Sequence, residues 1–338
     1  MYIFYLVIIT ILVLACWSFW GFVNDMQVAS FTALGFRGTA DFAIASFDVS
    51  EVIFSAIFFV VSTPFKFKHF IRIIENIDQI DSLVSSIFVK EIRKRTNIFV
   101  KVLAIFLPTL YILDLFMWGN NSWEGLNNYF AFYIMYSIVL VHELQYWQIM
   151  TMMYVRIMGL NKTLKDSFKN KTGLCEQDIF VIIQTYNYIH DSVEEINECF
   201  SFSTTIIIFS CYIHLVISPY QLFVVMSSIE TSIFHYVYLL WICLQIWRVL
   251  TIVEVCHKCE TQNQKTRNLV YQLLLCKLDK RIKKMVRTLF FIVTKRKLLL
   301  SAYALPKINR RLVISILSSI STYWMILMQS SARTIRMI

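Results

Sequence analysis

The 338-residue chain is short of charge, glycine and proline. Charged residues make up only 16% of it and hydrophobic residues 57%, whereas about a quarter of a typical soluble domain is charged. Seven glycines and four prolines are too few for a collagen-like, disordered or turn-rich β protein. The chain has more apolar surface than one soluble core could bury. Its composition therefore predicts a bundle of helices in lipid.

The sequence also lacks the signatures of catalysis. It contains no glycine-rich phosphate loop, no H-E-x-x-H motif and no G-x-S-x-G motif. Its eight cysteines fall in apolar stretches or in loops that we assign below to the cytoplasm, so we expect no disulfide framework. Cys256 and Cys259 have C-x-x-C spacing without a second ligand pair, which favours ordinary thiols over zinc. We expect neither an enzyme nor a cofactor.

Seven stretches are long and apolar enough to cross a bilayer, which takes about 20 residues per helix. The first stretch lacks the basic leader of a signal peptide and is longer than its hydrophobic core, so we expect it to be a helix. The prediction is an all-α membrane protein with seven transmembrane helices. Their ranges are 1–23, 42–65, 98–118, 127–155, 200–226, 231–247 and 312–332.

Positive charge is concentrated in alternate loops. Loops 66–97 and 156–199 and segment 248–311 hold 7, 5 and 16 lysines and arginines, which is 28 of the 32 in the chain. The positive-inside rule places these loops in the cytoplasm, so the N-terminus is predicted to be cytoplasmic and the C-terminus extracellular. This orientation is opposite to that of a G-protein-coupled receptor. We interpret the net charge of +10 as a marker of topology, not as a nucleic-acid surface, and the basic run 280–297 as solvated or in contact with anionic lipid.

These boundaries divide the chain into three parts. Residues 1–247 form a membrane bundle of six helices, 248–311 a cytoplasmic anchor segment, and 312–338 the last helix with a short outer tail. The predicted outer loops are too short to fold into a binding domain. A site for an external ligand must therefore lie between the outer halves of the helices.

The last predicted helix carries a stripe of polar residues. Ser315, Ser318, Thr322 and Gln329 follow one another at intervals of 3, 4 and 7 residues, and Met325 fills the gap, so all five share one helix face. Such a stripe is typical of hydrogen bonding between membrane helices. It is also typical of a pore wall built by several copies around an axis. The stripe alone slightly favours the first interpretation.

The local sequence resembles the signature that closes insect gustatory receptors. Residues 322–330 read TYWMILMQS, where the family has Thr-Tyr, five hydrophobic residues, Gln and Phe. Residues 305–312 and 191–200 are also similar to the family's approaches to its last and fifth helices. The resemblance implies a tastant-gated, non-selective cation channel in the plasma membrane of chemosensory neurons, assembled as a homo- or hetero-tetramer of gustatory receptor subunits. Such a channel mediates the perception of taste and has no nucleic-acid partner.

The resemblance also assigns the pore. By position, Gln329 would lie at its narrow outer part, with Thr322 and Tyr323 deeper. The predicted pore residues are Gln329, Ser330, Thr322, Tyr323, Ser318, Ser315 and Met325.

Three residues of the last helix bear on the function within the family. Ser330 replaces the gate Phe, and Arg333 would place positive charge at the outer mouth. Both favour, as an alternative, an accessory subunit or co-receptor that conducts only in a heteromer. Trp324 follows the Thr-Tyr pair where the family's sugar receptors tend to have an acid, which weakly favours a bitter or other non-sugar cue. A secondary transporter is the remaining alternative, although the two halves of the chain show no similarity.

Aromatic and acidic residues in the predicted spans form a candidate ligand site. An intramembrane carboxylate is costly and usually has a partner or a role, which singles out Asp114 and Glu143. Aromatic rings suit small, partly apolar or cationic molecules, although tyrosine and tryptophan also anchor helices at membrane surfaces. The predicted ligand residues are Asp114, Tyr111, Trp118, Tyr133, Tyr136, Glu143, Tyr212, Phe234, Tyr238 and Glu51.

Overall fold

The computed structural model describes residues 2–27, 39–83, 87–118, 123–169, 175–228, 232–296, 303 and 308–336. Within these ranges the chain forms helices and no strands, which confirms the predicted all-α class. The helices are α1 (Tyr2–Gln27), α3 (Thr39–Leu83), α4 (Ile87–Trp118), α5 (Trp123–Lys169), α6 (Glu176–Ser228), α7 (Ser232–Leu275), α8 (Lys280–Lys295) and α9 (Arg310–Arg336).

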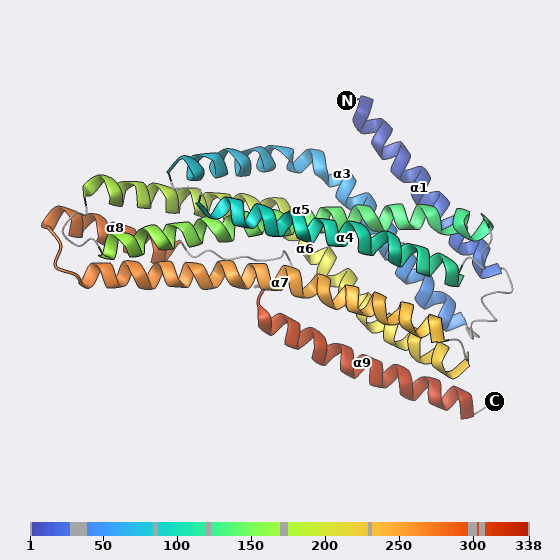
Figure 1. Ribbon diagram of the computed structural model, residues 1–338. Coiled ribbons are helices and arrows are strands. Elements are labelled where there is room, and N and C mark those ends of the chain that lie inside the picture. The colour runs from blue at the N-terminus through green and yellow to red at the C-terminus, as the bar shows by residue number, and fades with distance from the viewer. Residues whose placement is uncertain are drawn as a thin grey trace.

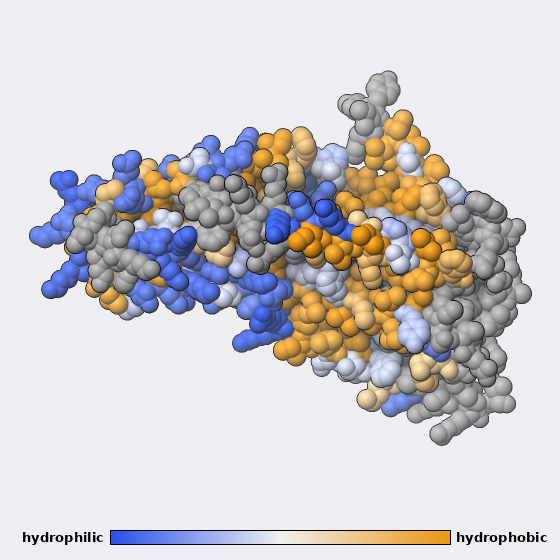
Figure 2. Space-filling model, viewed as in Figure 1, coloured by the Kyte–Doolittle hydropathy of each residue, from blue (hydrophilic) through white to orange (hydrophobic). Residues whose placement is uncertain are grey.

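The helices form an elongated bundle with two chemically different halves (Figure 1). Hydrophobic side chains cover the half that carries α1 and α9, here called the apolar half, and hydrophilic side chains cover the polar half, which ends at α8 (Figure 2). Among the described residues, five stretches are long and apolar enough to cross a membrane: Leu6–Val23, Ser46–Leu83, Thr96–Phe116, Glu176–Phe223 and His235–Leu275. The spans predicted in α5 and α9 are not among these five. The apolar half is the part that a bilayer would surround.

In the polar half the long helices pack like a coiled coil. Buried residues follow one another at alternating intervals of 3 and 4, which is the heptad pattern that interlocks neighbouring helices. In α6 they are Ile179, Ile182, Tyr186, Ile189, Val193, Ile196 and Phe200. In α5 they are Tyr146, Met150, Met153, Ile157, Leu160 and Leu164, and in α7 they begin with Val249, Ile252, Cys256 and Cys259.

This packing extends the helices beyond the predicted spans. The α6 helix already begins at Glu176, and α7 continues to Leu275. Segments 156–199 and 248–311 are therefore largely helical where the structure describes them, and α5, α6 and α7 form one continuous core. All eight cysteines are free. Cys256 and Cys259 are buried against α5, where they contact the Tyr146 hydroxyl and the Met150 carbonyl.

The basic run up to Lys295 lies on α8, at the tip of the polar half (Figure 1). Asp279 caps the helix by accepting a hydrogen bond from the backbone N–H of Arg281 at 3.4 Å. Val286, Leu289 and Val293 share the buried face, so the lysines and arginines of this amphipathic helix are left on its outer face. The distance of α8 from the apolar half supports solvation of this run over contact with lipid.

Candidate functional site

Polar and aromatic residues of α5 and α7 meet along one line inside the bundle, here called the polar seam. On each helix they are spaced by 3 or 4 residues or by 7, so each set occupies a single face. The seam consists of Tyr133, Tyr136 and Glu143 on α5 and Tyr238, Trp241, Gln245 and Arg248 on α7.

Asp114 of α4 bridges the two helices at the first contact of the seam. Its carboxylate accepts a hydrogen bond from the Tyr133 hydroxyl at 2.6 Å and another from the Trp241 indole N–H at 3.0 Å. Tyr111 stacks on the Tyr133 ring with centroids 4.6 Å apart. The predicted intramembrane acid is therefore buried among aromatic donors, as the cost of its desolvation requires.

The second contact joins Tyr136 and Gln245. The Gln245 side-chain amide donates to the Tyr136 hydroxyl at 3.1 Å. The Tyr136 ring also lies edge-on against Trp241, with centroids 5.1 Å apart. Tyr136 thus links the Asp114 group to the residues further along the seam.

The third contact is a buried ion pair between Glu143 and Arg248. Arg248 Nε donates to Glu143 Oε2 at 2.8 Å, and the two side chains are 0% and 7% exposed. A second guanidinium nitrogen donates to Gln245 Oε1 at 2.7 Å and to the Tyr136 hydroxyl at 3.2 Å. Charged groups this deep persist only when paired and hydrogen-bonded, so Glu143 fixes the position of Arg248.

Glu51 of α3 lies in a neighbouring polar group with α6. It accepts hydrogen bonds from Ser55 at 2.8 Å and from Ser210 at 3.0 Å. His214 places Nδ1 2.7 Å from Asp48 Oδ1 and Nε2 3.5 Å from Glu51 Oε2. The His214 ring also contacts Tyr136, at 6.5 Å between centroids, so this group adjoins the polar seam.

Two features near the seam are available to a ligand: buried polar groups without a hydrogen-bond partner among the described residues, and a groove. Within the described part of the chain, the Tyr238 hydroxyl and the terminal Nη2 of Arg248 are buried without a hydrogen-bond partner, a state that costs free energy unless water or a ligand satisfies it. A groove of about 590 Å³ also runs between α4 and α5, with Tyr111, Tyr133 and Ser137 in its wall. Its remaining lining is almost wholly apolar. This combination suits a small, largely apolar molecule with one or two polar groups.

The polar stripe of α9 faces away from the rest of its own chain. Ser315, Ser318, Thr322, Met325 and Gln329 are all exposed. The opposite face packs on the bundle through buried Ile316 and half-buried Leu312 and Ile320. In Figure 1, α9 lies along the outside of the bundle near one end.

Two polar contacts connect α9 to the bundle. The Tyr212 hydroxyl of α6 lies 2.9 Å from Ser319 Oγ, and its ring meets the Tyr323 ring edge-on at 6.5 Å. Arg310, at the start of α9, donates to both carboxylate oxygens of Glu254 on α7, at 2.9–3.2 Å. Tyr212, predicted as a ligand residue, thus contacts the last helix, and Tyr323 lies toward α6 instead of on the polar stripe.

Several predicted residues lie outside the described side chains: Trp118, Phe234, Ser330 and Arg333. The remaining ligand residues fall into the polar seam with its α4 neighbours, the Glu51 group, and Tyr212 at α9. Sequence reasoning missed Trp241, Gln245, Arg248 and His214. The spacing of Tyr238, Trp241, Gln245 and Arg248 along one face of α7 was the signal that could have found three of them.

Comparisons with known proteins identify the family. A family model described as 7tm Chemosensory receptor matches residues 1–332. The Drosophila melanogaster protein described as gustatory receptor for sugar taste 43a is 30% identical over 151 residues, or 41% of this chain, and the match spans about a third (34%) of that relative.

Solved structures show the same fold. The olfactory receptor OR5 of the insect Machilis hrabei superposes with a TM-score of 0.66 at 13% identity, covering 94% of this chain and 88% of the receptor. Its complex with eugenol gives 0.67 at 13% identity, with 93% and 88% covered. The family and the fold are those of receptors, not of enzymes, and the apolar helices are those of a multi-pass membrane protein. The chain belongs to the seven-transmembrane chemosensory receptor family.

Proposed function

We propose that this chain is a subunit of a tastant-gated, non-selective cation channel in the plasma membrane of chemosensory neurons. The observation that carries the proposal is the polar stripe of α9. Ser315 and Thr322 donate to carbonyls of their own helix, but their hydroxyl oxygens, Ser318 and the Gln329 amide still favour a polar surrounding within a membrane. Four copies of the chain around one axis supply it, because their α9 helices then enclose water.

The ligand binds at the polar seam and the groove beside it. The eugenol complex of the Machilis hrabei receptor supports this class of ligand, because that receptor has the same fold and binds a small molecule. The Asp114 carboxylate and the unpartnered hydroxyl of Tyr238 provide polar contacts in surroundings that are otherwise apolar and aromatic. Movement of α6 and α7 would reach α9 through Tyr212 and Glu254.

Expression of the chain alone in a cell without chemoreceptors tests the proposal. We expect a panel of small tastants to evoke inward cation currents, and Asp114→Asn to weaken the response. Silence both alone and beside every gustatory subunit of the same organism, with the protein at the cell surface, would contradict it. Silence alone and current beside a partner subunit would select the heteromeric alternative, which the Ser330 and Arg333 substitutions favour.

The chemical class of the ligand has two candidates. Trp324, next to the Thr-Tyr pair, favours a bitter or other non-sugar cue. The sugar-taste relative favours a sugar, through 30% identity over 151 residues. Matched applications of hexoses and of apolar bitter compounds to the same cells separate the two.

A further inference from the structure

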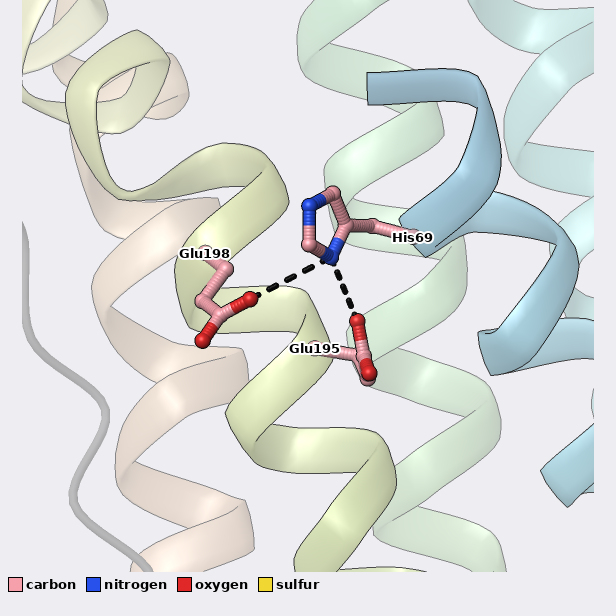
Figure 3. Close-up of side chains that lie close together, drawn as sticks. All are labelled: His69, Glu195 and Glu198. Carbon is pink, nitrogen blue, oxygen red and sulfur yellow. Dashed lines mark hydrogen bonds and ion pairs between the residues drawn. The ribbon is translucent and has the colours of Figure 1, made fainter. Parts of the chain in front are cut away.

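A histidine and two glutamates converge on one point between α3 and α6, away from the polar seam. His69 of α3 points at Glu195 and Glu198 of α6, which lie one turn apart on the same face (Figure 3). His69 Nδ1 is 2.6 Å from Glu195 Oε2 and 3.2 Å from Glu198 Oε2. These three potential ligand atoms all lie within 4.8 Å of one another.

This arrangement favours a proton or a metal cation between the three atoms. If Nδ1 of His69 presents its lone pair, that lone pair faces two carboxylates, which is repulsive. If Nδ1 carries a proton, it has one N–H for two carboxylate oxygens. A metal cation satisfies all three atoms at once, because neutral imidazole and carboxylate are both good ligands.

The surroundings orient the carboxylate of Glu195 toward this point. Arg72 binds Glu195 Oε1 at 3.0 Å and leaves Oε2 directed at His69. Such an outer partner fixes the orientation of a ligating carboxylate. Lys66, the other cation on this face of α3, donates instead to the Ser203 hydroxyl. Arg72 therefore offsets one carboxylate, and with neutral His69 a net negative charge remains.

We propose that His69, Glu195 and Glu198 bind a divalent transition-metal ion of the zinc class and thereby join α3 to α6. One nitrogen and two carboxylate oxygens are ligands that zinc accepts, and water completes a four-coordinate site. Bonds of about 2.0–2.2 Å in a tetrahedral site place the ligand atoms about 3.3 Å apart. The 3.2 Å separation already meets this value, and the 2.6 Å separation needs a side-chain shift of about 0.7 Å. Magnesium and calcium are disfavoured, because they prefer oxygen ligands alone.

The variants separate metal binding from the existing ion pairs. Glu198→Gln removes one ligand at a largely exposed position, with 64% of the side chain accessible, and leaves Arg72 on Glu195. His69→Gln removes the nitrogen ligand. His190→Gln is the matched control, since His190 also faces two acids, Asp191 and Glu194, but all three lie on α6 and Arg296 binds Asp191 at 3.2 Å.

The test is zinc titration of the purified, chelator-stripped full chain against a fluorescent competitor at pH 7.5, together with its melting temperature with and without zinc. We expect the wild type and His190→Gln to bind one more tight zinc ion per chain than His69→Gln and Glu198→Gln, or to bind it at least tenfold more tightly. Zinc, but not magnesium, should raise the melting temperature of the first two proteins only. Comparing variants removes the background from the eight thiols, which all four proteins share.

Equal zinc binding by all four proteins would overturn the proposal. So would a wild type that gains stability from acid but none from zinc, since a proton would then occupy the position between His69 and the glutamates. Neither result affects the proposed channel function, which rests on α9 and the polar seam.

Discussion

Replacing Glu143 by leucine tests the polar seam at its buried ion pair. The substitution removes the carboxylate 2.8 Å from Arg248 Nε and leaves a guanidinium with 0% exposure. Its other acceptors are neutral: the Tyr136 hydroxyl and Gln245 Oε1. The charge is therefore left without compensation inside the bundle.

The size of the effect follows from the cost of an unpaired buried charge. Removing one partner of a buried pair costs about 3–5 kcal/mol. An unfolding entropy of about 2.1 cal/mol/K per residue gives about 0.7 kcal/mol/K for a chain of this length. The melting temperature of Glu143→Leu should therefore fall by about 4–7 °C.

The assay is the melting temperature of the detergent-solubilised protein, followed by loss of its monodisperse gel-filtration peak. Asp166→Leu is the matched control, because Asp166 is exposed on the same helix and surface substitutions usually change stability by less than about 0.5 kcal/mol. The double variant Glu143→Leu with Arg248→Met should recover most of the loss, since apolar replacements of buried pairs are often neutral. An unchanged melting temperature in Glu143→Leu would refute the reasoning, and so would a double variant that loses the sum of both single effects.

Three further substitutions test the ligand site and its connection to α9. Asp114→Asn keeps the shape of the side chain but removes its charge. A charged hydrogen bond is worth about 1.5–3 kcal/mol, so the half-maximal ligand concentration should rise by about 10- to 150-fold. An unchanged dose–response curve would exclude Asp114 from ligand binding. Tyr212→Phe deletes the hydroxyl contact with Ser319. A net hydrogen bond is worth about 0.5–1.5 kcal/mol, so the ratio of open to closed channels should shift about 2- to 13-fold. Ser319→Ala should give the same shift, and different shifts in the two variants would count against the contact. Glu254→Arg should change the basal current up to about fivefold, because a surface ion pair is worth at most about 1 kcal/mol. Adding Arg310→Glu reverses the pair and should restore the basal current. Failure of the double variant to restore it would show that the pair does not couple α7 to α9.

The helical class and the exposed stripe of α9 could be predicted from local sequence. Length and apolarity predict a membrane helix wherever it packs, and the spacing of Ser315, Ser318 and Thr322 defines one face before any partner is known. The heptad of α6, from Ile179 to Phe200, was equally readable, but most of it fell in segment 156–199, which lies between two predicted spans and was interpreted as a loop. Because a heptad packs neighbouring helices along their whole length, it predicts helices that continue from the apolar half into the polar half.

The pairing of the buried charges was beyond local reasoning. Arg248 stands at the end of an apolar run, where the positive-inside rule interprets it as a cytoplasmic charge. The structure buries it against Glu143, a residue of another helix. Tyr212 likewise fits an aromatic ligand site by composition, and only the docking of α9 on α6 turns it toward Ser319. Such contacts depend on which helix faces pack against each other, and that information is distributed over the whole chain.

The central claim is that α9 lines a shared, ligand-gated pore. Its most direct test is thiol accessibility during ligand-evoked current, with single cysteines at Ser318 and Thr322 on the polar stripe. A cysteine at Leu317 is the control, because Leu317 is also exposed but lies about 100° and about 140° round the helix from these two positions. A charged, water-soluble thiol reagent should block current through the two stripe variants and leave Leu317→Cys and the wild type unaffected. Equal block at all three positions, or none at Ser318 and Thr322, would contradict the account.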